Sequence, residues 1–312
     1  MKQSNQKSIE LNKIYCGEAI KVLKEFPDNF VDCVVTSPPY WALRDYGVKE
    51  QIGLEEHFND YIKKLCDIFD EVKRVLKEEG TCWVNLGDTY YTKSGSSFLN
   101  DSLNTNKRIK ELGINKANAI RGRGLLKSKN LTLTPFRFAI EMQNRGWIIR
   151  NVIIWHKPNC MPTSVKDRFT TDFEYLFFLV KNKKYYFNQQ REPHKTESIK
   201  RTNYQWNGTR VKGSSFSGMN IKKMCHPKGR NKRCVWNIST GSYKGAHFAV
   251  YPEKLIEIPI LAGSPKEGII LDPFIGSGTT GVVAKKLNRR FLGIDINKKY
   301  CQLANKRIGG TK

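Results

Sequence analysis

Two prolines and two aromatic residues follow an apolar run near the beginning of the chain. The stretch Thr36-Ser-Pro-Pro-Tyr-Trp41 comes directly after Val31-Asp-Cys-Val-Val35, a pattern that predicts a buried strand ending in a rigid corner. Consecutive prolines fix φ twice and favour extended backbone in the residues before them, so the carbonyls of the corner are held in place. The Ser37 hydroxyl can donate or accept a hydrogen bond, and the Tyr40 ring offers a surface for stacking. We interpret the corner as a site for a flat ligand.

A glycine turn near the other end of the chain has the pattern of a nucleotide-binding loop. Residues 269–280, Ile-Ile-Leu-Asp-Pro-Phe-Ile-Gly-Ser-Gly-Thr-Thr, predict a strand, a Gly-x-Gly turn and the start of a helix. Such glycines let a ligand approach the backbone, and the helix start offers unpaired N–H groups. Asp295 closes the next apolar strand 19 residues after Gly276, where α/β nucleotide sites place a ribose-binding carboxylate. The turn lacks the third glycine of a dinucleotide fingerprint and the lysine of a P-loop, which favours a nucleoside without phosphates.

The segments around these two stretches predict an α/β fold. Apolar spacing predicts a helix from Leu54 to Glu79, stopped by Gly80, between strands at 31–36 and 81–86. Strand, crossover helix and strand form a parallel unit. Further expected elements are a helix from Thr134 to about Gly146, strands at 148–155 and 175–180, a sheet-edge extension at 184–188, a helix at 253–262, a strand at 268–271, a helix at 279–287, a strand at 290–294 and a last helix capped by Asn297.

The formal net charge of +25 is concentrated in two segments. Residues 181–234 contain 15 Lys and Arg against 2 acidic residues, and residues 93–137 contain 10 against 2. The composition of residues 90–131 predicts a long basic loop, and residues 189–244 show little apolar periodicity. A surface selected only for solubility would intersperse the two signs. The concentration of positive charge predicts a polyanionic partner and salt-dependent binding.

Membrane and metal-binding roles find little support in the sequence. The first residues lack the apolar core of a signal peptide, and no apolar run approaches the roughly 18 residues of a membrane span, so we expect a cytoplasmic protein. The 8 cysteines are scattered without a C-x-x-C pair, which predicts reduced thiols and no metal. Cys225, His226, Cys234 and His194 do not have the spacing of a zinc finger.

With both stretches in view, the chain resembles the amino-group DNA methyltransferases that use S-adenosylmethionine. Their catalytic signature has the form (Ser/Asp/Asn)-Pro-Pro-(Tyr/Phe/Trp), and their cofactor signature is similar to Asp272-Pro-Phe-Ile-Gly-Ser-Gly-Thr279. Here the catalytic stretch comes first, which is the motif order of the family's β group. The resemblance implies a Rossmann-like methyltransferase fold, with a doubly wound, mostly parallel sheet, a circularly permuted motif order and an inserted basic target-recognition region.

The resemblance divides the chain into three parts. Residues 1–188, with the basic loop at about 90–131, would form the catalytic half, residues 189–244 the target-recognition insert and residues 245–312 the cofactor-binding half. The implied catalytic residues are Ser37, Pro38, Pro39 and Tyr40. The implied cofactor residues are Asp272, Pro273, Phe274, Gly276, Ser277, Gly278, Thr279, Asp295, Glu18, Phe248 and Ala249; many relatives carry Gly-Asp where this chain has Gly17-Glu18. The basic insert supplies the DNA-binding candidates Arg210, Lys222, Lys223, Arg230, Lys232 and Arg233.

The implied reaction places an exocyclic amine of a flipped base against a sulfonium methyl group. Such an amine is a poor nucleophile, and rigid acceptors that hold its protons would help it attack without a covalent enzyme intermediate. In the family, Ser at the first motif position favours cytosine N4, and adenine N6 is the alternative. A basic DNA-binding protein with an inactive methyltransferase fold is a second alternative. Expected partners are double-stranded DNA and a possible cognate restriction endonuclease, with the chain a monomer or homodimer.

Overall fold

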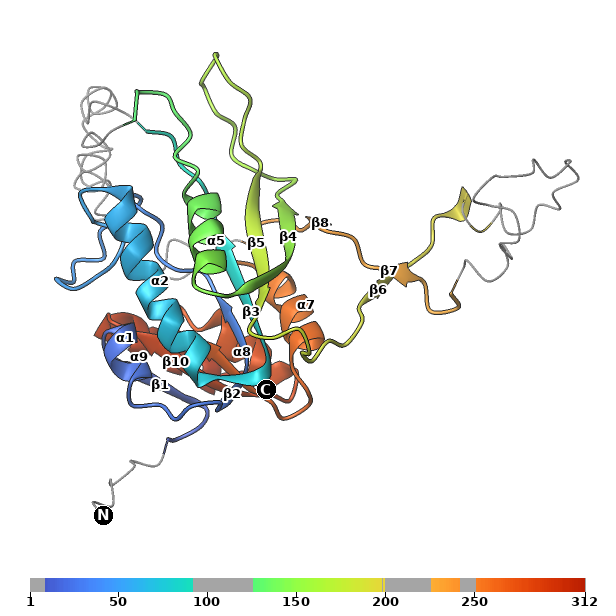
Figure 1. Ribbon diagram of the computed structural model, residues 1–312. Helices are drawn as coiled ribbons and strands as arrows, with labels where there is room; N and C mark the ends of the chain where they lie inside the picture. The colour runs from blue at the N-terminus through green and yellow to red at the C-terminus, as the bar shows by residue number, and fades with distance from the viewer. Residues whose placement is uncertain (1–8, 92–125, 198, 200–225, 242–250, 312) are drawn as a thin grey trace, which may run out of the picture. The chain divides into compact units, whose positions relative to one another are not determined.

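The computed structural model describes residues 9–91, 126–197, 199, 226–241 and 251–311 of the 312-residue chain (Figure 1). The chain forms two compact units. The larger unit comprises residues 1–187 and 234–312, and the smaller comprises residues 188–233. Both predicted motif stretches belong to the larger unit. No helix within the described ranges is long and apolar enough to cross a membrane.

The larger unit is built on an eight-stranded sheet with the order β1-β10-β9-β2-β3-β5-β4-β8. All neighbouring strands are parallel except the two pairs that β5 makes with β3 and β4. From the β9/β2 boundary, β10 and β1 extend to one side and β3 to the other, so this boundary is a topological switch point. The strands are β1 (Lys13–Cys16), β2 (Val31–Thr36), β3 (Leu76–Leu86), β4 (Ile148–His156), β5 (Phe173–Val180), β8 (Val235–Asn237), β9 (Ile269–Asp272) and β10 (Arg290–Asp295).

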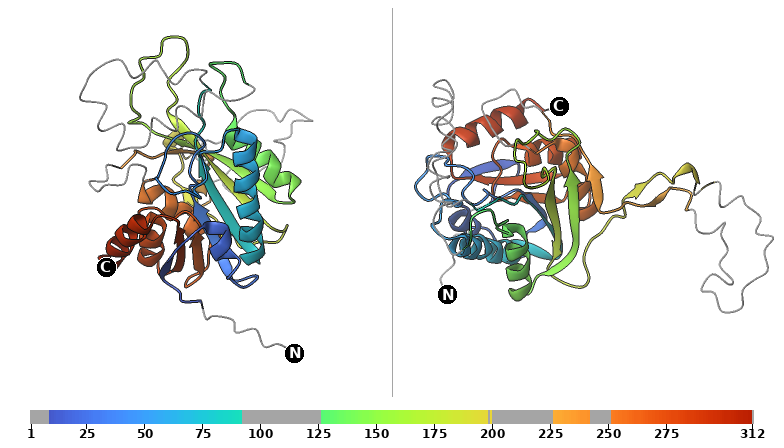
Figure 2. Two further views of the ribbon diagram at one scale, coloured as in Figure 1. Left: turned by 90° about the vertical axis from the view of Figure 1, so that its left-hand side faces the viewer. Right: turned by 90° about the horizontal axis from the view of Figure 1, so that it is seen from above.

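Helices cover both faces of this sheet (Figure 2). One face carries α1 (Ala19–Leu23), α2 (Phe58–Val75) and α5 (Thr134–Asn144), and the other carries α7 (Glu253–Gly263), α8 (Thr279–Lys286) and α9 (Lys298–Gly309). Alternate residues of β2 point to opposite faces, with Val34 in one apolar cluster and Cys33 and Val35 in the other. The prediction of a doubly wound, mostly parallel α/β fold is confirmed.

The helix predicted over residues 54–79 has different ends in the structure. It ends at Val75, and β3 begins at once with Leu76, so Gly80 lies inside a strand and does not stop a helix. The residues before Gly80 favour helix by their intrinsic propensity, but Leu76 is fully buried and pairs with Val31 of the neighbouring strand. Strand pairing and burial here outweigh local propensity.

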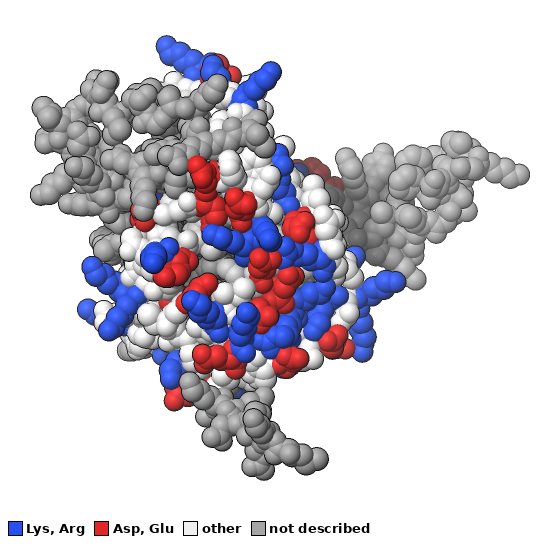
Figure 3. Space-filling view, turned by 60° about the vertical axis from the view of Figure 1, so that its left-hand side comes forward, with Lys and Arg blue, Asp and Glu red and all other residues white. Residues whose placement is uncertain are grey.

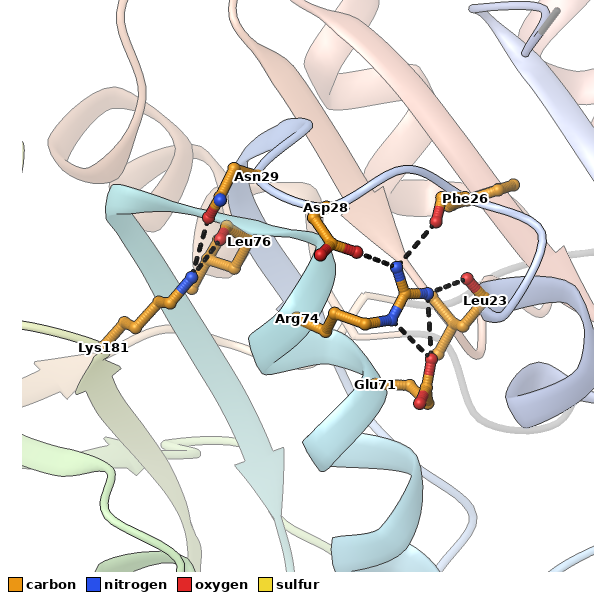
Figure 4. Close-up of polar contacts among 8 residues, drawn as sticks. All are labelled: Leu23, Phe26, Asp28, Asn29, Glu71, Arg74, Leu76 and Lys181. Atoms are coloured by element: carbon orange, nitrogen blue, oxygen red, sulfur yellow. Dashed lines mark hydrogen bonds and ion pairs between the residues drawn. The ribbon is translucent and has the colours of Figure 1, made fainter. Parts of the chain in front are cut away.

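Two cationic side chains fasten the junction between α2 and β3 (Figure 4). Lys181, which follows β5, donates to Asn29 Oδ1 at 2.8 Å and to Leu76 O at 3.1 Å. Arg74 reaches the α1–β2 connection with its guanidinium group. It donates to Leu23 O (2.7 Å), Phe26 O (2.8 Å), Asp28 Oδ1 (2.5 Å) and Glu71 Oε2 (2.9 Å). The connection before β2 is therefore fixed to the last turn of α2.

The borders of the predicted insert differ from those of the smaller unit. Val235–Asn237, expected within the insert, is instead β8 at the edge of the main sheet, where Trp236 is buried. Residues 184–188, expected to extend the sheet, form no strand. The smaller unit contains the two-stranded sheet of β6 (Arg191–Glu192) and β7 (Arg230–Asn231). Most of the predicted basic loop, residues 92–125, lies outside the described residues.

Candidate active site

The proline corner and the glycine turn line one cavity of about 650 Å³. The corner follows β2 and the turn follows β9, and these strands are parallel neighbours on either side of the switch point. Their carboxyl ends therefore lie at the same edge of the sheet. Predicted site residues in the cavity wall are Glu18, Ser37, Pro38, Pro39, Tyr40, Pro273, Phe274, Gly276, Ser277, Thr279 and Asp295. The two stretches therefore meet at one cavity, as the reaction implied by the resemblance requires.

The corner is fixed by contacts made behind the cavity wall. The hydroxyl of Tyr61 in α2 donates to Pro39 O at 2.9 Å. Trp41 is 1% exposed and donates from Nε1 to Glu55 O at 2.9 Å, so its ring belongs to the core and not to the cavity. Among the corner residues that line the cavity, Ser37 and Tyr40 carry a side-chain hydroxyl group.

The Tyr40 hydroxyl joins the corner to an ion pair on the neighbouring strands. It donates to Glu174 Oε2 at 2.7 Å and accepts from Ser37 Oγ at 3.4 Å. Glu174 Oε1 pairs with Lys157 Nζ, and both side chains are 18% exposed. Burial, followed by the nearby Glu174 charge, raises the pKa of Tyr40 well above its usual value, so the phenol stays neutral. The geometry gives the Tyr40 ring a single orientation at the cavity wall.

Gly87, just after β3, leaves the space that the Tyr40 ring occupies. A Cβ atom at this position would lie 2.8 Å from Tyr40 Cε2 and 3.3 Å from Glu174 Cγ. Both distances are shorter than ordinary van der Waals contacts between carbon atoms. The glycine therefore allows the ring and the carboxylate to pack against the end of β3.

The glycine turn and Asp295 form the other part of the cavity. Gly276 and Gly278 have φ values of +52° and +84°, a left-handed conformation that favours glycine. Asp295 accepts hydrogen bonds from Gly276 N at 3.0 Å and from Asn297 N at 2.7 Å, which fixes its carboxylate beside the turn. Burial raises the pKa of Asp295 to about 6. A hydroxyl-bearing ligand in the cavity would find here an ionised acceptor at neutral pH.

Two of the predicted cofactor residues, Asp272 and Gly278, are not among those that line the cavity. Asp272 is 0% exposed, and its carboxylate joins the ends of β2 and β9 to the start of α8. It accepts hydrogen bonds from Thr36 Oγ1 (2.6 Å), Tyr251 Oη (2.9 Å), Thr280 Oγ1 (2.5 Å) and Phe274 N (3.0 Å). A Cβ atom at Gly278 would lie 2.9 Å from Ala304 Cβ, so this glycine allows α8 and α9 to pack closely. Both residues position the turn from behind. Phe248 and Ala249 lie outside the described residues.

Comparison with known proteins assigns this arrangement to a family. Residues 31–306 match the family model described as DNA methylase. The sequence is 43% identical over 305 residues to the type II methyltransferase M.SmaI of Serratia marcescens, covering 95% of this chain and 90% of that protein. It is 40% identical over 304 residues to M.Cfr9I of Citrobacter freundii, covering 97% and 90%. The chain belongs to the DNA methylase family.

Solved structures share the fold of this DNA methylase. The PvuII DNA methyltransferase (cytosine-N4-specific) superposes with a TM-score of 0.61 at 18% sequence identity, covering 94% of this chain and 85% of that one. A putative DNA modification methylase from Thermus thermophilus, complexed with S-adenosyl-L-methionine, superposes with a TM-score of 0.59 at 23% identity, covering 95% and 93%. These matches confirm the Rossmann-like methyltransferase fold expected from the motif order.

The DNA-binding candidates of the methylase fall into two groups. Arg210, Lys222 and Lys223 lie outside the described residues. Arg230, Lys232 and Arg233 lie in or beside β7 of the smaller unit. There, Glu192 Oε1 is 2.9 Å from Arg230 Nε and 2.8 Å from Arg233 Nε. Partial burial works to raise the pKa of Glu192, but the two arginines lower it overall.

The methylase cavity contains residues that sequence reasoning missed. Glu174 and Lys157 stand where β5 begins and β4 ends, and only the antiparallel pairing of these strands brings them together. The sequence signal for Glu174 is that it is the one charged residue, near the beginning of an otherwise apolar strand, β5. Tyr46 and Tyr300 pack edge to face at 6.0 Å beside the glycine turn, and Tyr251 also lines the cavity.

Proposed function

We propose that this DNA methylase transfers a methyl group from S-adenosylmethionine to the exocyclic N4 of cytosine in duplex DNA, after the base has left the helix. The observation that carries the proposal is the shared cavity, in which the Ser37–Tyr40 corner faces the glycine turn and Asp295. The naming of its relatives as type II methyltransferases supports a restriction-modification or phage-protection context, with a possible cognate restriction endonuclease.

The cavity has the donors and acceptors that S-adenosylmethionine requires. Asp295 would accept from the ribose hydroxyls, and the tight backbone at Gly276 would allow the nucleoside to approach. Phe274, Tyr46 and Tyr300 supply apolar surface for the adenine ring, and Glu18 supplies negative charge for a cationic ligand. The fit of these groups supports this cofactor. When bound, it supplies an activated sulfonium methyl group.

The chain's own task at the corner is to orient a base and to hold its amine. Pro39 O is already bonded to Tyr61, so we assign the amine contacts to the Ser37 hydroxyl and the Pro38 carbonyl. Tyr40, held by Glu174, offers its ring as a stacking surface for the base. Preorganised acceptors of this kind lower the barrier because they need no reorientation during the reaction.

The choice of cytosine N4 over adenine N6 rests on Ser37. Both bases present an amine beside a ring-nitrogen acceptor, so hydrogen bonding alone does not separate them. In the resemblance described above, Ser at this position favours cytosine, and the fold is shared with a cytosine-N4-specific enzyme. Methylation of adenine N6 by the same residues is the alternative.

Expression in a methylase-free host tests the proposal directly. We expect mass spectrometry of nucleosides from its genomic DNA to find N4-methylcytosine, and sequencing with a modified-base readout to give the target sequence. N6-methyladenine would establish the alternative base, and 5-methylcytosine alone would overturn the mechanism. A chain that binds DNA but is not labelled by photo-cross-linking with radioactive S-adenosylmethionine would be an inactive DNA-binding protein.

A further inference from the structure

A long loop, residues 157–172, begins and ends at the rim of the cavity. It connects β4 to β5 and stands away from the sheet (Figures 1 and 2). The backbone closes its base, because Lys157 N donates to Asp172 O at 2.7 Å. Lys157 at its start and Glu174 just after its end both line the cavity. The two ends of this loop therefore lie next to the Tyr40 corner.

The two most exposed large apolar side chains of the described residues lie on this loop. Met161 is 88% exposed and Phe169 is 96% exposed, whereas Val235, the next, is 62% exposed. A single exposed apolar residue is ordinary on a protein surface. Two nearly uncovered side chains on one loop at an active-site rim are different, because water is an unfavourable environment for both and a partner would remove them from it.

The loop is held in place although its apolar side chains are uncovered. Among its contacts with neighbouring segments are the Lys129 Nζ–Asp167 Oδ2 ion pair (2.5 Å) and the Arg168 guanidinium, which lies 4.0 Å from the centroid of the Tyr90 ring. Hydrogen bonds also run from Asn159 Nδ2 to Thr240 O (3.2 Å) and from Thr240 N to Asn159 Oδ1 (2.9 Å). A preorganised loop loses less conformational entropy on binding than a loop that must first be ordered. Met161 and Phe169 are thus exposed on a loop that these contacts hold in a defined conformation.

Cations lie on the same loop and on the segment that contacts it, together with the acidic residues Asp167 and Asp172. Lys166 and Arg168 lie on the loop itself, and Lys127 and Lys129 lie on the segment that contacts it. This combination of cations and apolar side chains matches nucleic acid, whose phosphates surround a stack of apolar base faces. The loop therefore offers both kinds of contact that a duplex can use, one to its backbone and one to its bases.

We propose that Phe169 and Met161 enter the base stack of duplex DNA and fill the space left by the extruded target base. This inference rests on the proposed function, since it requires that a base leave the helix. Side chains such as Phe and Met are known to wedge between base steps and partly unstack them. The wedge would offset the lost stacking of the target base, and Lys166 and Arg168 would hold the flanking phosphates.

The test compares two duplexes that contain the target sequence found by genomic mapping. In one duplex the target base is normally paired, and in the other it stands opposite a mismatched base, so that part of the cost of extrusion is absent. We expect the Phe169→Ala, Met161→Ala double variant to lose roughly tenfold in kcat/KM on the paired duplex and less than about twofold on the mismatched duplex. With 2-aminopurine at the target position, the fluorescence rise on binding should also fall.

Control measurements separate the possible failures. Ile140→Ala, at a 59% exposed position on α5, is the matched control and should behave as wild type on both duplexes. The midpoint of thermal unfolding and the affinity for S-adenosylmethionine of the double variant should equal those of wild type. Equal activity of the double variant and wild type on the paired duplex, or equal loss on both duplexes, would overturn the wedge while the proposed function stands. A wild-type chain that methylates neither duplex would overturn the proposed function itself.

Discussion

The hydroxyl of Tyr40 connects the proline corner, which the sequence predicts, to the Glu174–Lys157 ion pair, which it does not. Glu174 lies between Tyr40 and Lys157, and its two carboxylate oxygens bind one partner each. The ring of Tyr40 is thereby fixed at the place where we propose that the base stacks. At the scale of single residues, the site depends on the Tyr40 ring in one part of the cavity and on the Asp295 carboxylate in the other.

Truncation of Tyr40 should reduce turnover more than DNA binding. Stacking of a base on an aromatic ring is worth about 1–3 kcal/mol, so Tyr40→Ala should lower the single-turnover rate of methylation ten- to hundredfold. Tyr40→Phe keeps the ring and removes the hydroxyl with its hydrogen bonds to Glu174 and Ser37, and it should retain most of this rate. DNA affinity, measured by fluorescence anisotropy, should change little in both. Full activity of Tyr40→Ala would exclude the stacking role.

The raised pKa of Asp295 predicts a pH dependence of cofactor binding. The free chain protonates this carboxylate as the pH falls through about 6, and a protonated carboxyl group is a poorer acceptor for ribose hydroxyls. The affinity for S-adenosylmethionine, measured by calorimetry between pH 5 and 8, should therefore fall below pH 6 and approach a tenfold loss per pH unit. Asp295→Asn should bind weakly and without this dependence. A flat profile for wild type would contradict the assignment.

The raised pKa of Asp295 affects the stability of the fold in the opposite direction to cofactor binding. Because the folded chain holds this proton more tightly than the unfolded chain, whose Asp has its ordinary pKa of 3.8, the contribution of Asp295 to stability decreases as the pH rises from about 4 to about 6. Cofactor binding and unfolding, measured across this window, should therefore respond to Asp295 in opposite directions.

At the scale of elements, the packing of α8 against α9 depends on Gly278. Its φ of +84° and the 2.9 Å separation from Ala304 Cβ both oppose a side chain. Gly278→Ala should lower the free energy of unfolding by roughly 1–3 kcal/mol, measured with urea. Gly309→Ala, in α9 with nothing within 4 Å of the added Cβ, is the control and should be neutral or slightly stabilising. Equal effects of the two substitutions would show that α8 and α9 do not pack as described.

Local sequence patterns predict some helices and strands of this fold, and tertiary contacts decide the others. The strands before the proline corner and the glycine turn were predictable because short apolar runs and turn residues act locally. The start of β3 at Leu76 was not, because its pairing with Val31 competes with helix propensity. Trp236 of β8 lies in a polar segment, and only its tertiary position marks it as core. Glu174 belongs to the site through pairing between distant strands, which a single sequence does not display.

At the scale of the whole molecule, positive charge is unevenly distributed. Figure 3 shows one face of the described residues, on which Lys and Arg alternate with Asp and Glu. The sequence segments with the greatest excess of positive charge, 93–137 and 181–234, are the basic loop and the region around the insert. A polyanion would therefore be attracted mainly by these segments.

Neutralising the insert should flatten the salt dependence of DNA binding. Replacing Lys222, Lys223, Arg230 and Lys232 by Gln should reduce the slope of log K against log salt by about 0.9 for each DNA phosphate that the variant no longer neutralises. The matched control replaces four lysines on the side of the molecule where β1, β2, β3 and β9 begin, away from the cavity and outside both basic segments. These lysines are Lys13, Lys24, Lys77 and Lys266, and the slope should stay unchanged. Equal slopes for both quadruple variants would exclude the insert from the DNA interface.

The strand order has a consequence for how the protein is made. β9 and β10 lie between β1 and β2 in the sheet, although they are the last strands to leave the ribosome. Until residue 272 has been synthesised, β2 lacks its second neighbour and the growing chain carries an open, apolar strand edge in its middle. A nascent chain interrupted before this point has neither a closed sheet nor a cavity, so premature termination yields an aggregation-prone fragment and not a partly active enzyme.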